Sequence, residues 1–165
     1  MDQKELSGGG IVLHTGVHSF DLLRFLTQEE VDRVSCTLNQ VSTRETEDNF
    51  SATMTFVKSP IIASVMGSRG TEGRNGLIEL AGENGQVVAD HVHNYLLVIK
   101  GMERKPVALG EPIPTVYEAL RAFYDSLCRK VPFPVTAEDG AIALAIAEAC
   151  YRSAKTGRWE KVHHF

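Results

Sequence analysis

A long run of strand-like segments, from residue 31 to residue 109, constrains the fold more than any other feature of this sequence. Apolar and polar residues alternate over 31–41 and again over 49–56, a period of two that is typical of half-buried strands. A polar turn over 43–48 joins these segments, and no helix-length pattern interrupts the run. Because parallel neighbours need long crossover connections, such short turns predict antiparallel pairing.

Helical patterns flank this run. We predict a helix over 18–27, a second beginning at Pro114 and Thr115, and a third that Thr136 and Asp139 cap and Gly157 ends. Further strands are predicted at 61–68, 77–81, 86–90, 95–100, 105–109 and 158–162. Helices at both ends with strands between them indicate an α+β fold, a single open, mostly antiparallel β-sheet with helices packed on one face.

Length and charge exclude several classes of protein. The 165 residues suffice for one domain with its own core, and the formal net charge of −4 argues against a nucleic-acid partner. No apolar run approaches the ~20 residues that span a bilayer, and the N-terminus has no apolar signal segment, so we expect no membrane partner. Cys36, Cys128 and Cys150 are read as reduced and buried, which predicts a cytoplasmic protein.

The stretch from Gly8 to Leu26 carries the clearest functional signal. It reads GGGIVLHTGVHSFDLLRFL, a glycine triplet, an apolar run, two histidines on either side of a glycine, and an amphipathic segment. The glycines allow close approach of another chain segment or a ligand. His14 and His18 are therefore expected at a loop-to-helix transition, where side chains often project into a cleft.

This stretch resembles the GGGxLxDxGxHxxD signature that opens the C-terminal domain of the Gfo/Idh/MocA oxidoreductases. The matching positions are Gly8, Gly9, Gly10, Leu13, Gly16, His18 and Asp21, whereas His14 stands where the family has aspartate. Residues 135–162 resemble the closing helix and last strand of the same domain. The resemblance implies a flexible lead-in over 1–7 and a C-terminal domain over 8–162, with the N-terminal Rossmann domain absent from these residues.

The resemblance implies the substrate-binding and oligomerisation domain of an NAD(P)-dependent oxidoreductase that acts on a sugar, a polyol or a related hydroxyl compound. NAD or NADP would be bound mainly by the absent domain, so the chain alone would not be catalytic. The alternative is a stand-alone dimerising module that binds a ligand or directs assembly, with no enzymatic role. A homo-oligomer is expected through a polar sheet face, although a solvated face is the other interpretation. That face comprises Ser35, Thr37, Asn39, Ser51, Thr53 and Thr55.

The resemblance gives His18 the role of catalytic residue, a substrate-hydroxyl ligand and proton-relay member, because histidine changes charge near neutral pH. His14 is a second substrate-binding candidate. A neutral imidazole accepts one hydrogen bond and an imidazolium none, so the exchange of aspartate for His14 suggests a different substrate. Asp21 is read as structural, a carboxylate in the first turn of its helix.

Other candidates are set aside. His14, His18 and Asp21 could form a metal site with His91 and His93, but they lack metal-binding spacing and we predict no metal. The glycine triplet follows no strand and lacks the GxGxxG pattern, so it is no dinucleotide fingerprint. Three residues, Arg69, Arg74 and Lys105, are expected to be solvated turn or loop cations, although loops with glycine hinges can also close over a ligand.

Overall fold

The computed structural model describes residues 2–164 and divides them into two compact units. The terminal unit comprises residues 2–70 and 135–164, and the middle unit comprises residues 71–134. The sequence predicts one domain without an interior linker, and that prediction stands beside a division of the described residues into two compact units. Each unit contains one sheet.

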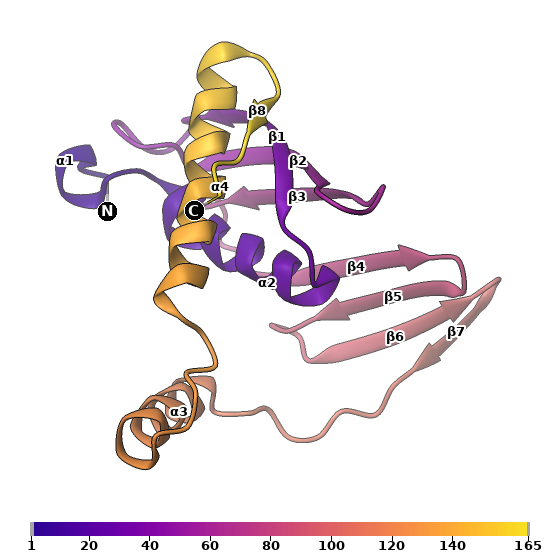
Figure 1. Ribbon diagram of the computed structural model, residues 1–165. Helices are drawn as coiled ribbons and strands as arrows, with labels where there is room; N and C mark the ends of the chain where they lie inside the picture. Colours follow the sequence, from indigo (N-terminus) through magenta and orange to yellow (C-terminus); the bar gives the residue numbers. More distant parts are fainter. Residues whose placement is uncertain (1, 165) are drawn as a thin grey trace. The chain divides into compact units, whose positions relative to one another are not determined.

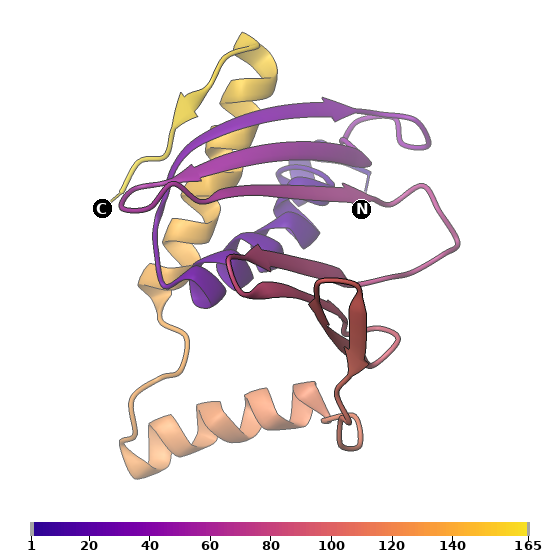
Figure 2. The same cartoon turned by 90° about the vertical axis from the view of Figure 1, so that its right-hand side faces the viewer.

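The terminal unit is a four-stranded antiparallel sheet with helices on one face. Its strands are arranged in the order β3-β2-β1-β8 (Figure 1). Their bounds are β1 Val31–Asn39, β2 Asn49–Phe56, β3 Ile62–Ser68 and β8 Glu160–Lys161. The helices are α1 Lys4–Ser7, the π-helical turn η1 Val12–Gly16, α2 Val17–Thr27 and α4 Ala137–Thr156. Figure 2 shows α4 running behind β1–β3.

The middle unit is an antiparallel meander followed by a helix. Its strands lie in sequence order, β4-β5-β6-β7. The bounds are β4 Leu77–Gly82, β5 Gly85–Asp90, β6 Tyr95–Lys100, β7 Glu103–Pro106 and α3 Thr115–Arg129. The predicted hairpin at residues 82–85 is confirmed, because Gly82 pairs with Gly85 at the turn. Lys105 lies within β7, where it pairs with Val98, rather than in a turn.

The α+β class and the antiparallel pairing are confirmed, but the strands form two four-stranded sheets where the sequence predicted one. The segment between β3 and β4 is bonded at each end to its own unit, so β4 does not continue the first sheet. At one end the Arg69 N–H donates to the Asp48 carbonyl at 2.7 Å, and at the other the Gly76 N–H donates to Asp90 Oδ1 at 3.1 Å. Alternation along a strand indicates which face is buried, but it does not indicate which edges pair.

The core of the terminal unit lies between α4 and the apolar face of the sheet. Ala145, Ile146 and Ala149 are almost fully buried, and their short or compact side chains let α4 approach β1 closely. Ser153 fixes this approach, because its Oγ accepts the Cys36 N–H at 2.9 Å and donates to the Arg158 carbonyl at 2.6 Å. The buried set therefore includes a satisfied hydroxyl as well as hydrocarbon.

Helix α4 begins and ends as its sequence predicts. The Thr136 hydroxyl accepts the Asp139 N–H, and the Asp139 carboxylate accepts the Thr136 N–H at 2.8 Å, which is a complete capping box. Gly157 ends the helix with φ of 67°, a left-handed conformation that glycine adopts without steric cost. Both local predictions are confirmed because each depends on residues within one turn of the helix end.

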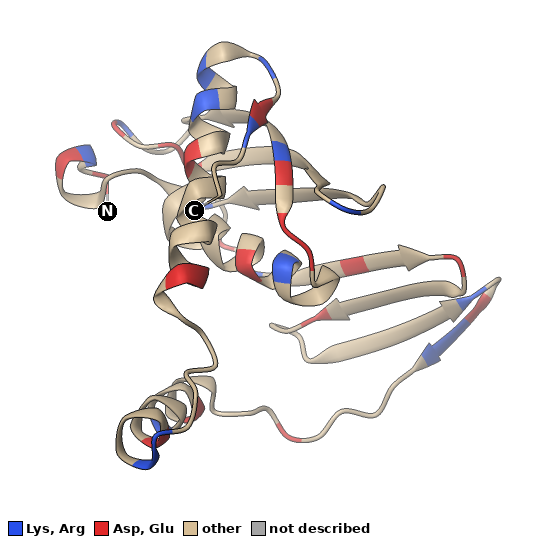
Figure 3. Cartoon of the chain, viewed as in Figure 1, with Lys and Arg blue, Asp and Glu red and all other residues tan. Residues whose placement is uncertain are grey.

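The polar face of the terminal sheet is assembled as predicted. Register pairs Ser35 with Thr53 and Thr37 with Ser51, so the hydroxyl side chains of β1 and β2 share one face. Register on β3 adds Ile62 opposite Thr55 and Met66 opposite Ser51. These two apolar side chains are 72% and 79% exposed. Strands β2 and β3 carry no Lys, Arg, Asp or Glu (Figure 3), so the face is uncharged along these two strands.

Residues 1–7 were predicted to be a flexible lead-in, and residues 4–7 form a single helical turn, α1. The Asp2 carboxylate accepts backbone N–H groups of Arg44 and Glu45 at 2.8 and 3.0 Å. These bonds lower the pKa of Asp2 to about 2. The lead-in therefore contacts the turn between β1 and β2, and its mobility stays a prediction.

Candidate functional site

The glycine triplet is explained by a buried carboxylate from a distant turn. Glu47 Oε1 accepts the Gly10 N–H at 2.9 Å and the Val12 N–H at 3.2 Å, while its backbone carbonyl accepts the Ile11 N–H at 3.0 Å. A Cβ on Gly10 would lie 1.9 Å from that carbonyl oxygen, so only glycine allows this approach. The sequence predicted only a polar turn over residues 43–48, and its pattern gave no sign of the role of Glu47.

Tyr151 completes the cluster around Glu47. Its hydroxyl donates to Glu47 Oε1 at 2.7 Å, and a Cβ on Gly9 would lie 2.3 Å from that hydroxyl oxygen. Burial, together with the hydrogen bond to the carboxylate, raises the pKa of Tyr151. The phenol therefore stays protonated at neutral pH and acts as a fixed donor, which makes the cluster structural.

The helix that carries the histidines begins earlier than predicted. Residues 12–16 form a π-helical turn that continues directly into α2, whereas the sequence predicted a loop until His18. The Glu47 carboxylate satisfies N–H groups at the start of this helix, which is the role of an N-cap residue supplied here from elsewhere in the chain. His14 consequently lies inside a π-bulge, a feature that occurs often at functional sites.

His14 makes two hydrogen bonds that identify its protonation state. Its Nδ1 lies 2.9 Å from an Arg69 guanidinium nitrogen, and its Nε2 lies 3.4 Å from the Ser7 carbonyl oxygen. A guanidinium only donates, so Nδ1 accepts and the ring proton is assigned to Nε2. His14 is therefore a neutral ring with both nitrogens engaged. The prediction that Arg69 is a solvated loop cation is wrong, because a contact across 55 residues holds its head group.

His18 lies one helical turn after His14 and is exposed. Four residues correspond to about one turn in α- and π-helical geometry alike, so the two rings lie on the same side of the helix. The structure thus brings both sequence-predicted site residues together, one engaged by Arg69 and the other accessible to a ligand.

Asp21 is structural, but not through the helix terminus. It lies in the second turn of α2 and accepts from Arg24 at 3.3 Å. Arg24 also donates to Glu30 at 2.7 Å and to Asp139 at 3.4 Å, so one guanidinium joins α2 to β1 and α4. The hydrogen bond to Glu30 raises the pKa of Arg24, and the same bond lowers the pKa of Glu30.

The histidines of the middle unit bind the loop that precedes β4. His91 Nδ1 donates to the Gly76 carbonyl at 3.1 Å, and His93 Nε2 donates to the Arg74 carbonyl at 3.1 Å. Among residues 2–164, no three His, Cys, Asp or Glu side chains are placed to share a metal ion.

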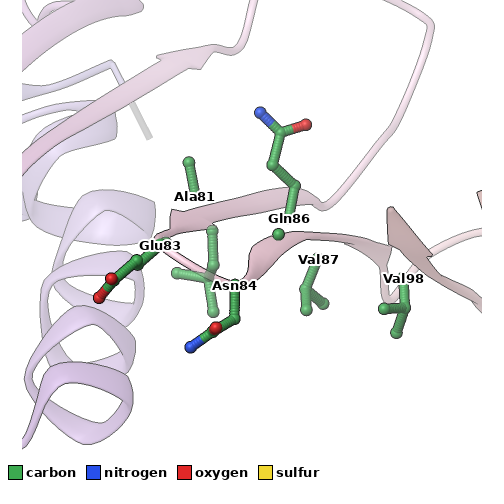
Figure 4. Close-up of a pocket in the computed structure, with 9 residues that line it drawn as sticks. Ala81, Glu83, Asn84, Gln86, Val87 and Val98 are labelled. Carbon is green, nitrogen blue, oxygen red and sulfur yellow. The ribbon is translucent and has the colours of Figure 1, made fainter. Parts of the chain in front are cut away.

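Two surface hollows differ in their chemistry. One, of about 560 Å³, is lined by Gln3, Leu6, Ser7 and His14 in the terminal unit. The other, of about 360 Å³, lies at the β4–β5 turn of the middle unit (Figure 4). Val87 and Val98, a cross-strand pair, point to the same side of that hairpin in Figure 4. Only the first hollow contains a residue that the sequence had singled out.

The comparison with known families agrees with this geometry. The family model described as the GFO/IDH/MocA C-terminal domain matches residues 1–88, slightly more than half of the 165-residue chain. The chain belongs to this family. The matched segment contains the glycine triplet, both histidines, Glu47 and Arg69.

Similar proteins place this GFO/IDH/MocA C-terminal domain in longer chains. A myo-inositol 2-dehydrogenase from Thermotoga maritima is 26% identical over 165 residues, covering 93% of this chain and 49% of the relative. An aldose-aldose oxidoreductase from Caulobacter crescentus, solved with glycerol, superposes with a TM-score of 0.85 at 23% identity, covering 96% of this chain and 49% of that one. A levoglucosan dehydrogenase solved with NADH gives 0.83 at 18% identity, with 99% and 53% covered. The chain spans about half the length of the curated relative it matches.

The helix that carries the histidines does not begin as a dinucleotide fingerprint does. The backbone N–H groups at the start of the π-helical turn are engaged by the Glu47 carboxylate. No strand precedes this helix within residues 2–11, and β1, β2 and β3 pair antiparallel, whereas the fingerprint requires a parallel βαβ unit. No helix among residues 2–164 has the length and hydropathy needed to cross a membrane.

Proposed function

We propose that this chain is the substrate-binding and oligomerisation domain of an NAD(P)-dependent oxidoreductase that acts on a sugar, a polyol or a related hydroxyl compound. One observation carries the proposal. The glycine–histidine segment folds as a helix whose first N–H groups bond to Glu47, and His18 on this helix is exposed to solvent. The chain spans about half the length of the curated dehydrogenase that it matches. The chain alone is inactive, because a second lobe holds the NAD or NADP.

His18 takes the chemical role within this chain. An accessible imidazole can accept the proton of a substrate hydroxyl and return it. The clamp at Glu47 fixes the helix start, so the ring is carried by a rigid element rather than a loop. The nicotinamide of the other lobe supplies the redox chemistry when bound.

The exposed apolar surface of α3 is an argument for a partner lobe. Its apolar stripe, Val116, Leu120, Phe123 and Leu127, follows helical spacing, yet these side chains are 73%, 64%, 55% and 59% exposed. A stripe of this kind on a helix is normally buried. A second lobe that covers α3 would account for it.

The polar face of the terminal sheet is the proposed contact between copies. Ile62 and Met66 are exposed on a face that lacks charge along β2 and β3, which suits close approach of a second sheet. Met66→Lys should shift the sedimentation coefficient of the full-length protein to that of a smaller species. Val41→Lys, at a loop position that is 74% exposed, is the control. An unchanged Met66→Lys assembly would exclude this face.

The enzyme proposal is tested in two steps. Calorimetric titration of the 165-residue chain with NADH and NADPH should show no saturable binding, and tight binding by these residues alone would overturn the division of labour. The chain is then joined to its upstream nucleotide-binding half and assayed on sugars, on polyols and on their carboxylate and phosphate derivatives. His18→Ala should lower kcat/KM by about 100-fold or more, while His163→Ala, at another exposed histidine, should not.

The same assay distinguishes the proposed enzyme domain from the alternative, a stand-alone assembly module. An assembly module would dimerise and bind its ligand, yet restoring the upstream half would produce no NAD(P)-dependent turnover on any of these sugars, polyols or anionic derivatives. Turnover that does not depend on His18 would keep the enzyme and remove His18 from its chemistry.

A further inference from the structure

The guanidinium of Arg69 is held in place but carries an unneutralised charge. It is half-buried and donates to His14 Nδ1 at 2.9 Å, and its backbone N–H donates to the Asp48 carbonyl at 2.7 Å. Within residues 2–164, no Asp or Glu oxygen lies within 4.0 Å of its nitrogens. A fixed cation without a counter-ion is unusual, because half-buried charges are normally paired.

The nearby carboxylates are committed elsewhere. Glu47 is bound to the Gly10 and Val12 N–H groups and to Tyr151. The Asp48 carboxylate accepts the N–H groups of Val41 and Thr43 at 2.9 and 3.1 Å, and also that of Ser42. Neither carboxylate forms an ion pair with Arg69. The guanidinium therefore has no counter-ion among residues 2–164, and its charge is available to a ligand.

The imidazole of His14 is what leaves this charge free. An aspartate at this position would pair with the guanidinium and neutralise it. A neutral imidazole accepts one of the five N–H donors and orients the head group without cancelling its charge. The exchange therefore raises the local charge by one unit and leaves Arg69 with donors for two oxygens of a planar or tetrahedral anion.

We propose that Arg69, positioned by His14, binds an anionic group, a carboxylate or a phosphate, on the hydroxyl substrate. This deepens the proposed function, on which it rests, by naming a substrate class: sugar acids or sugar phosphates rather than neutral polyols. His14 is the positioning residue, and its Nε2–H on the Ser7 carbonyl fixes the ring that receives the guanidinium. His18, exposed and one turn along the helix, is the group proposed to meet the hydroxyl end of such a substrate.

The test measures binding to the 165-residue chain by calorimetry, with three probes. They are D-gluconate for the carboxylate, D-glucose 6-phosphate for the phosphate, and D-glucitol as the neutral polyol. At least one anionic probe should bind about tenfold or more tightly than D-glucitol, as expected for a charge-assisted bidentate contact. Which of the two binds identifies the anion.

Variants test whether Arg69 and His14 cause the preference for anionic over neutral probes. Arg69→Gln should abolish the difference between anionic and neutral probes, while Arg74→Gln, which removes an exposed loop arginine five positions later, should leave it intact. His14→Asp should neutralise Arg69 and lower anion affinity about tenfold with D-glucitol binding retained. His14→Gln, whose amide oxygen can still accept from Arg69, should restore anion binding to within about threefold of the natural chain.

The outcomes separate this inference from the function on which it rests. Equal binding of D-glucitol and both anions, or an unchanged preference in Arg69→Gln, overturns the anion site and leaves the polyol oxidoreductase standing. A chain that binds none of the three probes also overturns it. Loss of the enzyme proposal is read independently, from the NADH titration and the His18→Ala kinetics.

Discussion

In the terminal unit the apolar faces of sheet and helix are buried against each other, whereas in the middle unit the apolar side chains are half-buried on the sheet and mostly exposed on α3. All the buried hydrophobic residues of 2–164 belong to the terminal unit, with Phe20, Met54 and Ile146 fully enclosed. The middle unit has equally regular strands and an apolar stripe on α3, yet Phe123 and Leu127 are more than half exposed. Secondary structure alone therefore does not distinguish the two.

The difference teaches where each unit obtains its stability. Burying a large apolar side chain contributes about 1.5–3 kcal/mol, and the terminal unit makes many such contributions among its own elements. The middle unit relies on the hydrogen bonds of its meander and on loop contacts such as those of Asp90. We expect the first unit to fold unaided and the second to gain stability only if the proposed second lobe covers it.

The largest expected effect comes from truncating one aromatic ring in each unit. Phe20→Ala should lower the free energy of unfolding by about 3–5 kcal/mol, because Phe20 is fully buried and packs edge-to-face on Phe50. Phe123→Ala, at a ring that is 55% exposed, should lower it by less than about 1 kcal/mol. Urea unfolding followed by circular dichroism measures both. Equal losses would break the comparison.

The buried carboxylate of the terminal unit gives the next effect. Glu47→Gln keeps the shape of the side chain but removes the charge that receives two backbone N–H groups and the Tyr151 hydroxyl. The expected loss is about 1.5–3 kcal/mol. Glu72→Gln, at an exposed position of the middle unit, should change the unfolding free energy by less than about 0.5 kcal/mol. Similar losses from both variants would show that Glu47 does not stabilise the start of the helix.

Acid should act on the turn between β1 and β2 before it acts on the core. The backbone N–H of Ser42, followed by those of Val41 and Thr43, holds the pKa of Asp48 below its usual range. A lowered folded pKa means that this stabilisation is present above the unfolded value of about 4 and is lost as pH falls through the folded one. Asp48→Asn should therefore be less stable than the natural chain at pH 7 and should lose less stability on acidification. Thermal unfolding between pH 7 and pH 2 checks this, and parallel curves would contradict it.

The smallest effect is chemical rather than energetic. Cys36 and Cys150 are buried in the terminal unit, whereas Cys128 is exposed on α3, contrary to the expectation that all three cysteines are buried. A thiol reagent should therefore label one cysteine rapidly in the native chain and all three after unfolding. Cys128→Ser should remove the rapid phase. Rapid labelling of two or three thiols in the native chain would show that the terminal core opens readily.

Several features were fixed by residues close together in the sequence. The alternation over 49–56 predicted β2 with its observed bounds, and Thr136, Asp139 and Gly157 predicted both ends of α4. The polar face followed from the same alternation, once register placed Ser35 opposite Thr53. These predictions succeed because strand period, capping and turns depend on side chains within a few positions of one another.

The candidate site depended on contacts that no local pattern contains. Glu47 reaches Gly10 across 37 residues, and Arg69 reaches His14 across 55. The glycine triplet signalled close approach, but only the folded chain shows that the approaching group is a carboxylate that caps a helix. Sequence by itself determined the family, the elements and the two histidines. Tertiary structure decided which sheet each strand joined, where the helix began and which cation faces His14, because these follow from packing between segments far apart in the chain.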